Sequence, residues 1–110
     1  MDTLTDTHAA ALARLGYALS DAGRARILMR LRGGEATPSE LVLLLGASKQ
    51  AVSNQLACLR ECGLVVAERR GRNQVYRLTQ AALADALDAL AAVILDVDPD
   101  CCGPEGCTCR

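Results

Sequence analysis

The spacing of the apolar residues changes at Gly63, and this change constrains the fold more than any other feature of the chain. Before Gly63 apolar residues recur every three or four positions, which indicates amphipathic helices. After it they alternate with polar residues, and the alternation predicts strands over residues 64–68 and 74–78. Helical spacing then returns. The pattern predicts a mainly α fold with one small β-hairpin.

Capping residues place the ends of the helices around that hairpin. Thr37 and Glu40 have the form of a capping box, in which Thr37 caps a helix and Glu40 reaches back to it. Ser48 and Thr79 are expected to cap two later helices. The helices are expected over residues 4–19, 22–32, 41–45, 49–62 and 80–97.

The two short helices, over residues 41–45 and 49–62, are separated by three turn residues. This spacing is typical of a helix-turn-helix. The hairpin that follows carries Arg69, Arg70 and Arg72 in its expected five-residue tip. A helix-turn-helix followed at once by a basic hairpin predicts a winged helix, which is a DNA-binding fold.

The helix over residues 49–62 has an apolar face and a polar face, and the polar one suits the DNA major groove. Gln and Asn side chains can pair with adenine there, while arginines of the hairpin can reach phosphates or the minor groove. The alternative is a merely solvated face and a tip that keeps the hairpin soluble. The apolar face consists of Val52, Leu56 and Leu59, and the polar face of Gln50, Ser53, Asn54 and Ala57. The residues expected to contact DNA are Ser48, Lys49, Gln50, Ser53, Asn54, Gln55, Arg69, Arg70 and Arg72.

Charge and composition limit the partners and the compartment. The net charge is −1, but residues 49–77 carry six bases and two acids, so nucleic acid would meet the middle of the chain. The first residues contain acids and no apolar stretch, and no membrane span is readable, which predicts a cytoplasmic protein. An enzyme is not expected, because His8 is the only histidine and no phosphate-cradling glycine loop occurs.

Residues 1–97 are expected to form one DNA-binding and dimerisation domain, and residues 98–110 a cysteine-rich metal-binding tail. The last helix carries a leucine-rich stripe that no later element can cover, so we expect it to pack on a second copy of the chain. The stripe consists of Leu83, Leu87, Leu90 and Ile94.

Six cysteines in a cytoplasmic protein favour metal ligation or redox sensing over disulfides, because that compartment keeps thiols reduced. Cys58 and Cys62 lie one helical turn apart and could share one ion. Further ligands must come from the tail, where Cys101 and Cys102 follow the last helix closely. Farther along, Cys107 and Cys109 are candidates for additional ligands, and the alternative is that they belong to an idle tail.

A site made of thiolates favours thiophilic ions such as Cd²⁺, Pb²⁺, Hg²⁺, As(III), Cu(I) or Zn²⁺. Cys58 and Cys62 could instead be two small buried hydrophobic residues. Two other functions also fit the cysteines. One is a thiol-redox-sensing repressor of the same fold, and the other is a cysteine-rich metal-buffering protein without DNA affinity.

Residues 11–97 resemble the ArsR/SmtB family of metal-responsive repressors. The most specific stretches are residues 18–28, 51–65 and 76–78. Within the family the chain is similar to actinobacterial cadmium and lead sensors, which place the same Cys-Leu-Arg-x-Cys-Gly-Leu-Val segment at the end of the recognition helix; here that segment is residues 58–65.

The resemblance implies a homodimer formed through the first and last helices. It also implies that the metal-free protein binds a palindromic operator and that Cd²⁺ or Pb²⁺ releases it. A third thiolate would follow the Asp-rich segment 97–100, which makes Cys102 the nearest equivalent and Cys101 the second. The family's other metal sites are not expected, because Thr37 and Ser39 stand where many relatives carry cysteines and the last helix lacks histidine.

Overall fold

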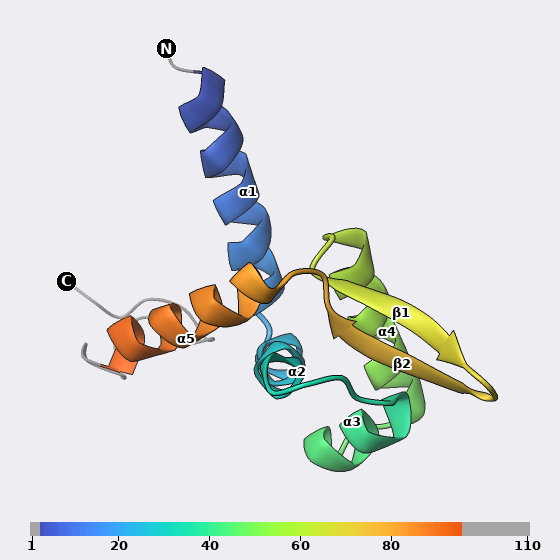
Figure 1. The fold of residues 1–110 in the computed structure, drawn as a ribbon. Coiled ribbons are helices and arrows are strands. Elements are labelled where there is room, and N and C mark those ends of the chain that lie inside the picture. Colours follow the sequence, from blue (N-terminus) through green and yellow to red (C-terminus); the bar gives the residue numbers. More distant parts are fainter. Residues whose placement is uncertain (1–2, 96–110) are drawn as a thin grey trace.

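The computed structural model describes residues 3–95, and within them five helices surround one two-stranded sheet (Figure 1). This confirms the mainly α fold with a single hairpin. The expected tail, with the domain border at residues 97–98, lies outside the described residues. The elements are α1 (Thr3–Leu19), α2 (Ala22–Arg32), α3 (Pro38–Leu45), α4 (Lys49–Glu61), β1 (Val65–Arg70), β2 (Asn73–Leu78) and α5 (Ala81–Leu95).

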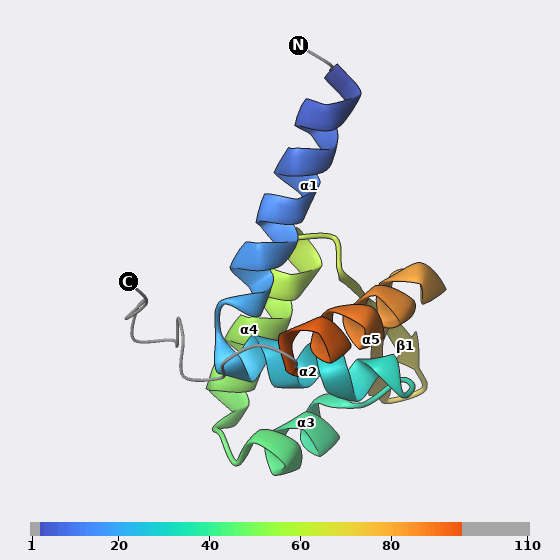
Figure 2. The same cartoon turned by 90° about the vertical axis from the view of Figure 1, so that its left-hand side faces the viewer.

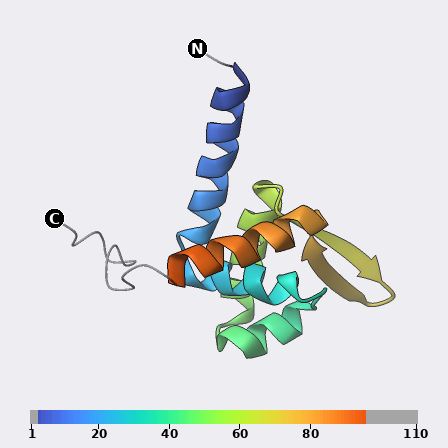
Figure 3. The same ribbon diagram turned by 60° about the vertical axis from the view of Figure 1, so that its left-hand side comes forward.

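Helices α2, α3 and α4 form the body of the fold, and the hairpin extends from it as a wing (Figures 1 and 3). Helix α1 projects away from this body, and α5 lies along α2 (Figure 2). The buried cluster at the centre is aliphatic apart from one tyrosine, as a chain without Phe or Trp requires. It consists of Ala18, Ile27, Leu28, Leu31, Ala36, Leu41, Val52, Leu56, Leu59, Val65, Tyr76, Leu78 and Leu87.

Helix α3 begins with the expected Thr37 cap, but only half of the predicted capping box is present. Thr37 caps α3, because its Oγ1 accepts a hydrogen bond from the Glu40 N–H at 3.3 Å. The Glu40 carboxylate does not complete the predicted box. It pairs with the Arg30 guanidinium of α2 at 3.1 Å, since a cation from a neighbouring helix offers a stronger, charge-assisted bond.

Thr79 does not cap the last helix, contrary to the sequence-based expectation. Its hydroxyl donates to the Gly63 carbonyl at 2.8 Å, and its N–H donates to the Leu64 carbonyl at 3.0 Å. Helix α5 begins at Ala81. Thr79 therefore closes the base of the wing by joining the end of β2 to the segment between α4 and β1.

The strands are longer and the turn is shorter than the sequence predicted. The antiparallel ladder runs from Val65↔Leu78 to Arg70↔Asn73, which leaves only Gly71 and Arg72 as turn residues. Gly71 has φ +62°, a conformation that glycine adopts without steric cost. The hydrophobic alternation marked only the half-buried part of the ladder, whereas backbone pairing continues through exposed polar residues.

A second contact attaches the wing to the body. The N–H and carbonyl of Ala36, just before α3, pair with those of Tyr76 in β2 at 3.0 and 2.8 Å. Both residues are buried. This isolated bridge sets the position of the wing relative to the helix-turn-helix.

The stripe on α5 is partly covered within the chain, which corrects the expectation that it waits entirely for a partner. Leu87 is only 3% exposed, and Leu83 packs against the same core. Helix α2 also pairs its Arg32 with Asp88 of α5. Leu90 remains exposed, and the side chain of Ile94 lies outside the described set.

Candidate nucleic-acid interface and thiol pair

The exposed face of α4 is the strongest candidate for reading DNA. Ser48 caps the helix by accepting the Ala51 N–H at 3.1 Å, which leaves its hydroxyl hydrogen available to a phosphate. Gln50 donates through Nε2 to Asn54 Oδ1 at 2.9 Å, so the two amides are ordered as a pair one turn apart. The exposed residues of this face are Lys49, Gln50, Ser53, Asn54 and Ala57.

Gln55 does not belong to that face. Its side chain is half-buried, and Nε2 donates to the Asp21 carboxylate of α2 at 3.1 Å. One residue along a helix turns the side chain by about 100°, which moves it from the side of Asn54 to the side of α2. The Gln55 amide therefore faces α2 in this structure and lies apart from the other α4 residues expected to contact DNA.

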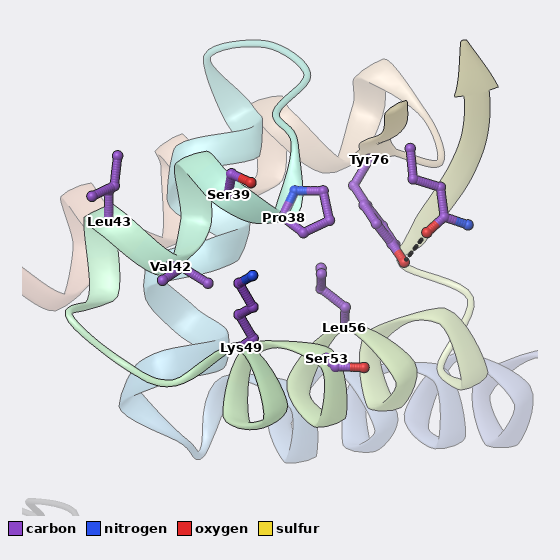
Figure 4. Close-up of a pocket in the computed structure, with 9 residues that line it drawn as sticks. Pro38, Ser39, Val42, Leu43, Lys49, Ser53, Leu56 and Tyr76 are labelled. Atoms are coloured by element: carbon purple, nitrogen blue, oxygen red, sulfur yellow. Dashed lines mark hydrogen bonds between the residues drawn. The ribbon is translucent and has the colours of Figure 1, made fainter. Parts of the chain in front are cut away.

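A hollow of about 490 Å³ lies beside the reading face, between α3, α4 and β2 (Figure 4). Lys49 points into the space between the two helices, and Ser53 stands at its edge (Figure 4). Across it, the Tyr76 hydroxyl donates to Gln74 Oε1 at 3.4 Å. Sequence reasoning missed this hollow because three separate segments form it. Its walls are Pro38, Ser39, Val42, Leu43, Lys49, Ser53, Leu56, Gln74 and Tyr76.

The arginines of the wing are not equivalent. Arg70, in β1, pairs with Glu35 and with Glu68, and these carboxylates raise the pKa of its guanidinium, Glu35 by hydrogen bonding first of all. Arg69 and Arg72 are exposed, and Arg72 stands in the turn itself. In the isolated chain the Arg70–Glu35 ion pair therefore joins the wing to the α2–α3 connection.

Removing the Glu35 carboxylate, which pairs with Arg70, is expected to strengthen the salt dependence of DNA binding. In Glu35→Gln the Arg70 guanidinium loses its main ionic partner and becomes available to a phosphate. The slope of log K against log salt should steepen by roughly one per wing. Asp85→Asn removes an exposed acid from α5 and serves as the control. An unchanged slope in Glu35→Gln would show that Arg70 stays away from DNA.

Cys58 and Cys62 lie on the other side of α4. Both are free thiols with half-buried side chains. Helix α4 ends between them, and Cys62 is its C-cap, with its N–H donating to the Cys58 carbonyl at 3.0 Å. The two thiols are close enough to interact electrostatically. They point roughly 140° and 180° away from Ser53 around the helix axis, so an ion held there need not touch DNA.

The surroundings of the pair keep Cys62 protonated at neutral pH. Burial raises the pKa of the Cys62 thiol, and the neighbouring Cys58 raises it further through its charge and its hydrogen bond. Arg14 of α1 and Arg24 of α2 act in the opposite direction. Because a metal binds the thiolate, ion capture here should release a proton and strengthen as pH rises.

Two soft donors side by side fit a thiophilic ion, but they do not complete a site. The described residues contain no group of three His, Cys, Asp or Glu side chains that could hold a metal. Cys101, Cys102, Cys107 and Cys109, the other expected ligands, lie outside residues 3–95. His8 is exposed on α1. Between residues 3 and 95, no helix has the length and apolarity needed to cross a membrane.

Known proteins are similar to this chain in both sequence and fold. Residues 21–66 match the family described as "Bacterial regulatory protein, arsR family". The chain is 51% identical over 90 residues to the HTH-type transcriptional regulator CmtR of Mycobacterium tuberculosis (strain ATCC 25618 / H37Rv), an alignment that covers 82% of this chain and 76% of the relative.

Two solved structures extend the comparison. The NMR structure of the cadmium metal-sensor CMTR from Mycobacterium tuberculosis matches with a TM-score of 0.66 and 50% identity, covering 81% of this chain and 92% of that one. The homodimeric winged helix-turn-helix DNA-binding domain Mb0332 from Mycobacterium bovis matches with a TM-score of 0.74 and 30% identity, covering 87% and 88%. With the family match and the identity to CmtR, these likenesses show that the chain belongs to the ArsR family of bacterial regulatory proteins and is a winged helix-turn-helix transcriptional regulator.

Proposed function

We propose that this ArsR-family member is a homodimeric repressor that binds palindromic operator DNA in its metal-free state and releases it when a thiophilic ion binds. Cd²⁺ and Pb²⁺ are the favoured ions, and As(III), Hg²⁺ and Zn²⁺ are the others to be compared. The protein would act in the cytoplasm, where operator DNA is found.

The exposed face of α4 supports the DNA-binding half of the proposal. Gln50 and Asn54 present ordered amides that can exchange their mutual bond for a base edge. Arg72 in the wing turn would reach the backbone or the adjacent minor groove. Helix and wing would thus bind DNA from two points, which suits a winged helix.

Exposed apolar side chains on α1 and α5 support the dimer. Leu12 and Tyr17 of α1 are 67% and 60% exposed, and Val93 of α5 is 63% exposed. Their burial against a second copy would remove apolar surface from water and place two reading helices on one operator. The solved relative from Mycobacterium bovis is itself described as homodimeric.

The thiol pair carries the metal-binding half. Cys58 and Cys62 lie at the end of the reading helix and on the side opposite Ser53, so their movement would change the orientation of α4 without blocking its DNA face. Cys102, with Cys101 as the second choice, would supply the third thiolate from the tail of the same or the partner subunit. The similar protein from Mycobacterium tuberculosis is described as a cadmium sensor.

The chain's own residues would convert ion capture into DNA release. When a soft ion is bound it supplies a bond to each thiolate. Cys58 and Cys62 would then be drawn toward the tail, and the end of α4 would tilt against α1 and α2. The amides at the other end of α4 would leave their alignment with the groove. Because the coupling is reciprocal, operator DNA weakens metal binding by the same factor.

The geometry of the pair favours shared ligation over a disulfide between these two cysteines. Cα atoms one turn apart in a helix are separated by about 6 Å, near the long end of the range that a disulfide spans. A disulfide also needs the sulfur atoms about 2 Å apart, so the last turn of α4 would have to deform. Shared ligation needs only that both sulfur atoms approach one ion, which side chains one turn apart on a helix can do.

Anaerobic cadmium titration of the reduced protein tests the proposal. Sulfur-to-metal charge-transfer absorption should rise with added Cd²⁺, and fluorescence anisotropy should show operator release over the same range. Oxidation without metal is the second arm. If only oxidation releases the operator, the thiol-redox alternative holds. If the protein binds Cd²⁺ but has no operator affinity at any stage, the metal-buffering alternative holds.

A further inference from the structure

Gln55 joins the thiol side of α4 to the N-terminus of α2. It lies one turn before Cys58 and two turns before Cys62, on the same strip of the helix. Its Nε2 donates to Asp21 Oδ2 at 3.1 Å, and the amide rests directly on Gly23. A Cβ atom at Gly23 would clash with Nε2, so a larger residue there would displace the amide from this position.

Asp21 is a rigid anchor for this bond. It is the N-cap of α2, and its Oδ2 also accepts the Arg24 N–H at 2.9 Å. The Arg24 guanidinium in turn donates to the Ala18 and Tyr17 carbonyls at the end of α1, at 3.0 and 2.9 Å. One side chain of α4 is thus tied to the junction of α1 and α2, and the charge of the same Arg24 also acts on the Cys62 thiol.

The contact between Gln55 and Asp21 can break at a modest cost in free energy. Gln55 Oε1 is buried and has no hydrogen-bond partner among the described residues. An unpartnered buried oxygen penalises the position that holds it. If α4 moves away from α2, the amide loses one hydrogen bond to Asp21 but gains solvent for both of its polar atoms. The free-energy difference between the closed and open positions is therefore smaller than the Asp21 bond alone would suggest.

We infer that Gln55 is a positioning residue for allosteric release, a latch that holds the reading helix in its DNA-binding orientation until the thiols move. The inference rests on the proposed function, because it assigns the contact through which ion capture reaches the DNA face. Loss of the latch shifts the population toward the metal-binding orientation. Operator affinity then falls and metal affinity rises, each in proportion to the change in the population of the orientation that binds that ligand.

The opposite signs separate a latch from a merely structural contact, whose loss would weaken both ligands or neither. The first variant is Gln55→Leu, which keeps a side chain of similar size, removes the hydrogen bond and adds no metal ligand. Gln80→Leu makes the same replacement at an exposed position outside the site. We expect Gln55→Leu to bind the operator about threefold more weakly and Cd²⁺ about threefold more tightly, because a shift of about tenfold in a balanced two-state equilibrium changes each population by about threefold.

Gly23→Ala tests the position of the Gln55 amide on Gly23 without changing either hydrogen-bonding residue. The added methyl group displaces the amide, so this variant should follow Gln55→Leu in both affinities. Gly33→Ala, at the C-cap of the same helix, is its control, because a Cβ there meets only the Arg30 carbonyl at an ordinary 3.6 Å. Circular dichroism melting of each variant verifies that it is folded.

A donor–acceptor exchange provides the rescue. Gln55→Glu places a second carboxylate beside Asp21 and should open the latch by repulsion. In the double variant Asp21→Asn with Gln55→Glu, the Asn amide can donate to the new carboxylate while its carbonyl still caps α2, and the net charge of the pair is unchanged. Operator and Cd²⁺ affinities should return toward those of the wild type.

The outcomes distinguish failure of the latch from failure of the proposed function. Wild-type protein that fails to bind Cd²⁺, or keeps its operator when loaded, overturns the proposed function. If the wild type releases its operator normally, the latch alone is refuted by three results: Gln55→Leu and Gly23→Ala lower the affinities for operator and Cd²⁺ together, leave both affinities unchanged, or differ from each other in the sign of the change. Opposite shifts in both variants, reversed by the exchange, support it.

Discussion

The double variant Cys58→Ser with Cys62→Ser is expected to bind the operator as the wild type does and to remain bound at cadmium concentrations that release the wild type. Serine keeps the size and the half-buried position of each side chain, and the C-cap of α4 uses only backbone atoms, so the DNA-binding orientation should persist. For each thiolate removed, cadmium affinity should fall by more than the roughly 10- to 100-fold that loss of an outer-shell partner costs. Anisotropy with labelled operator, under anaerobic conditions, measures both effects.

Single tail variants locate the remaining ligand. Cys102→Ser should abolish release, whereas Cys107→Ser and Cys109→Ser should have little effect and serve as matched controls. If Cys101→Ser replaces Cys102→Ser as the damaging change, only the register of the tail is revised. Release of the double variant at wild-type cadmium concentrations would refute the assignment of Cys58 and Cys62 as ligands.

A triple variant of the reading face, Gln50→Ala with Ser53→Ala and Asn54→Ala, is expected to lose most of its preference for the operator. Each well-formed base contact contributes about 1–3 kcal/mol of discrimination, so the loss should exceed a hundredfold. All three side chains are exposed, and the core face of α4 is untouched, so stability should hardly change. Competition between operator and scrambled DNA gives the measurement.

The wing supplies the contrasting control. Arg72→Ala should weaken binding to operator and scrambled DNA by the same factor and make the salt dependence shallower, because a phosphate contact carries no base information. Retention of operator preference by the triple variant would mean that α4 does not read the groove. Cadmium binding should survive in every one of these variants, since Cys58 and Cys62 face the other side of the helix.

Much of the fold could be predicted because the signals are local. The apolar face of α4, namely Val52, Leu56 and Leu59, is buried as its spacing predicted. Thr37 and Ser48 cap the helices they precede, since a cap uses N–H groups only three residues away. The exposed polar face of α4 and the adjacent thiols follow from the same helical period.

Three side chains have partners that the sequence did not predict and that lie far away in the chain. Gln55 turns toward Asp21, 34 residues distant, and Arg70 pairs with Glu35 at the same kind of separation. Thr79 closes the wing on Gly63 instead of capping α5. Each of these side chains has several acceptable local partners, and the chain's packing chooses among them.

The amino-acid sequence alone determined the order of helices and strands, the two faces of the reading helix and the closeness of Cys58 to Cys62, because backbone periodicity and capping act over a few residues. Only the tertiary structure decided which polar side chains of α4 face solvent or α2, which arginine of the wing is held by acids, and where the hollow beside Tyr76 lies. Those features depend on the meeting of segments whose separation in sequence carries no information about their distance in space.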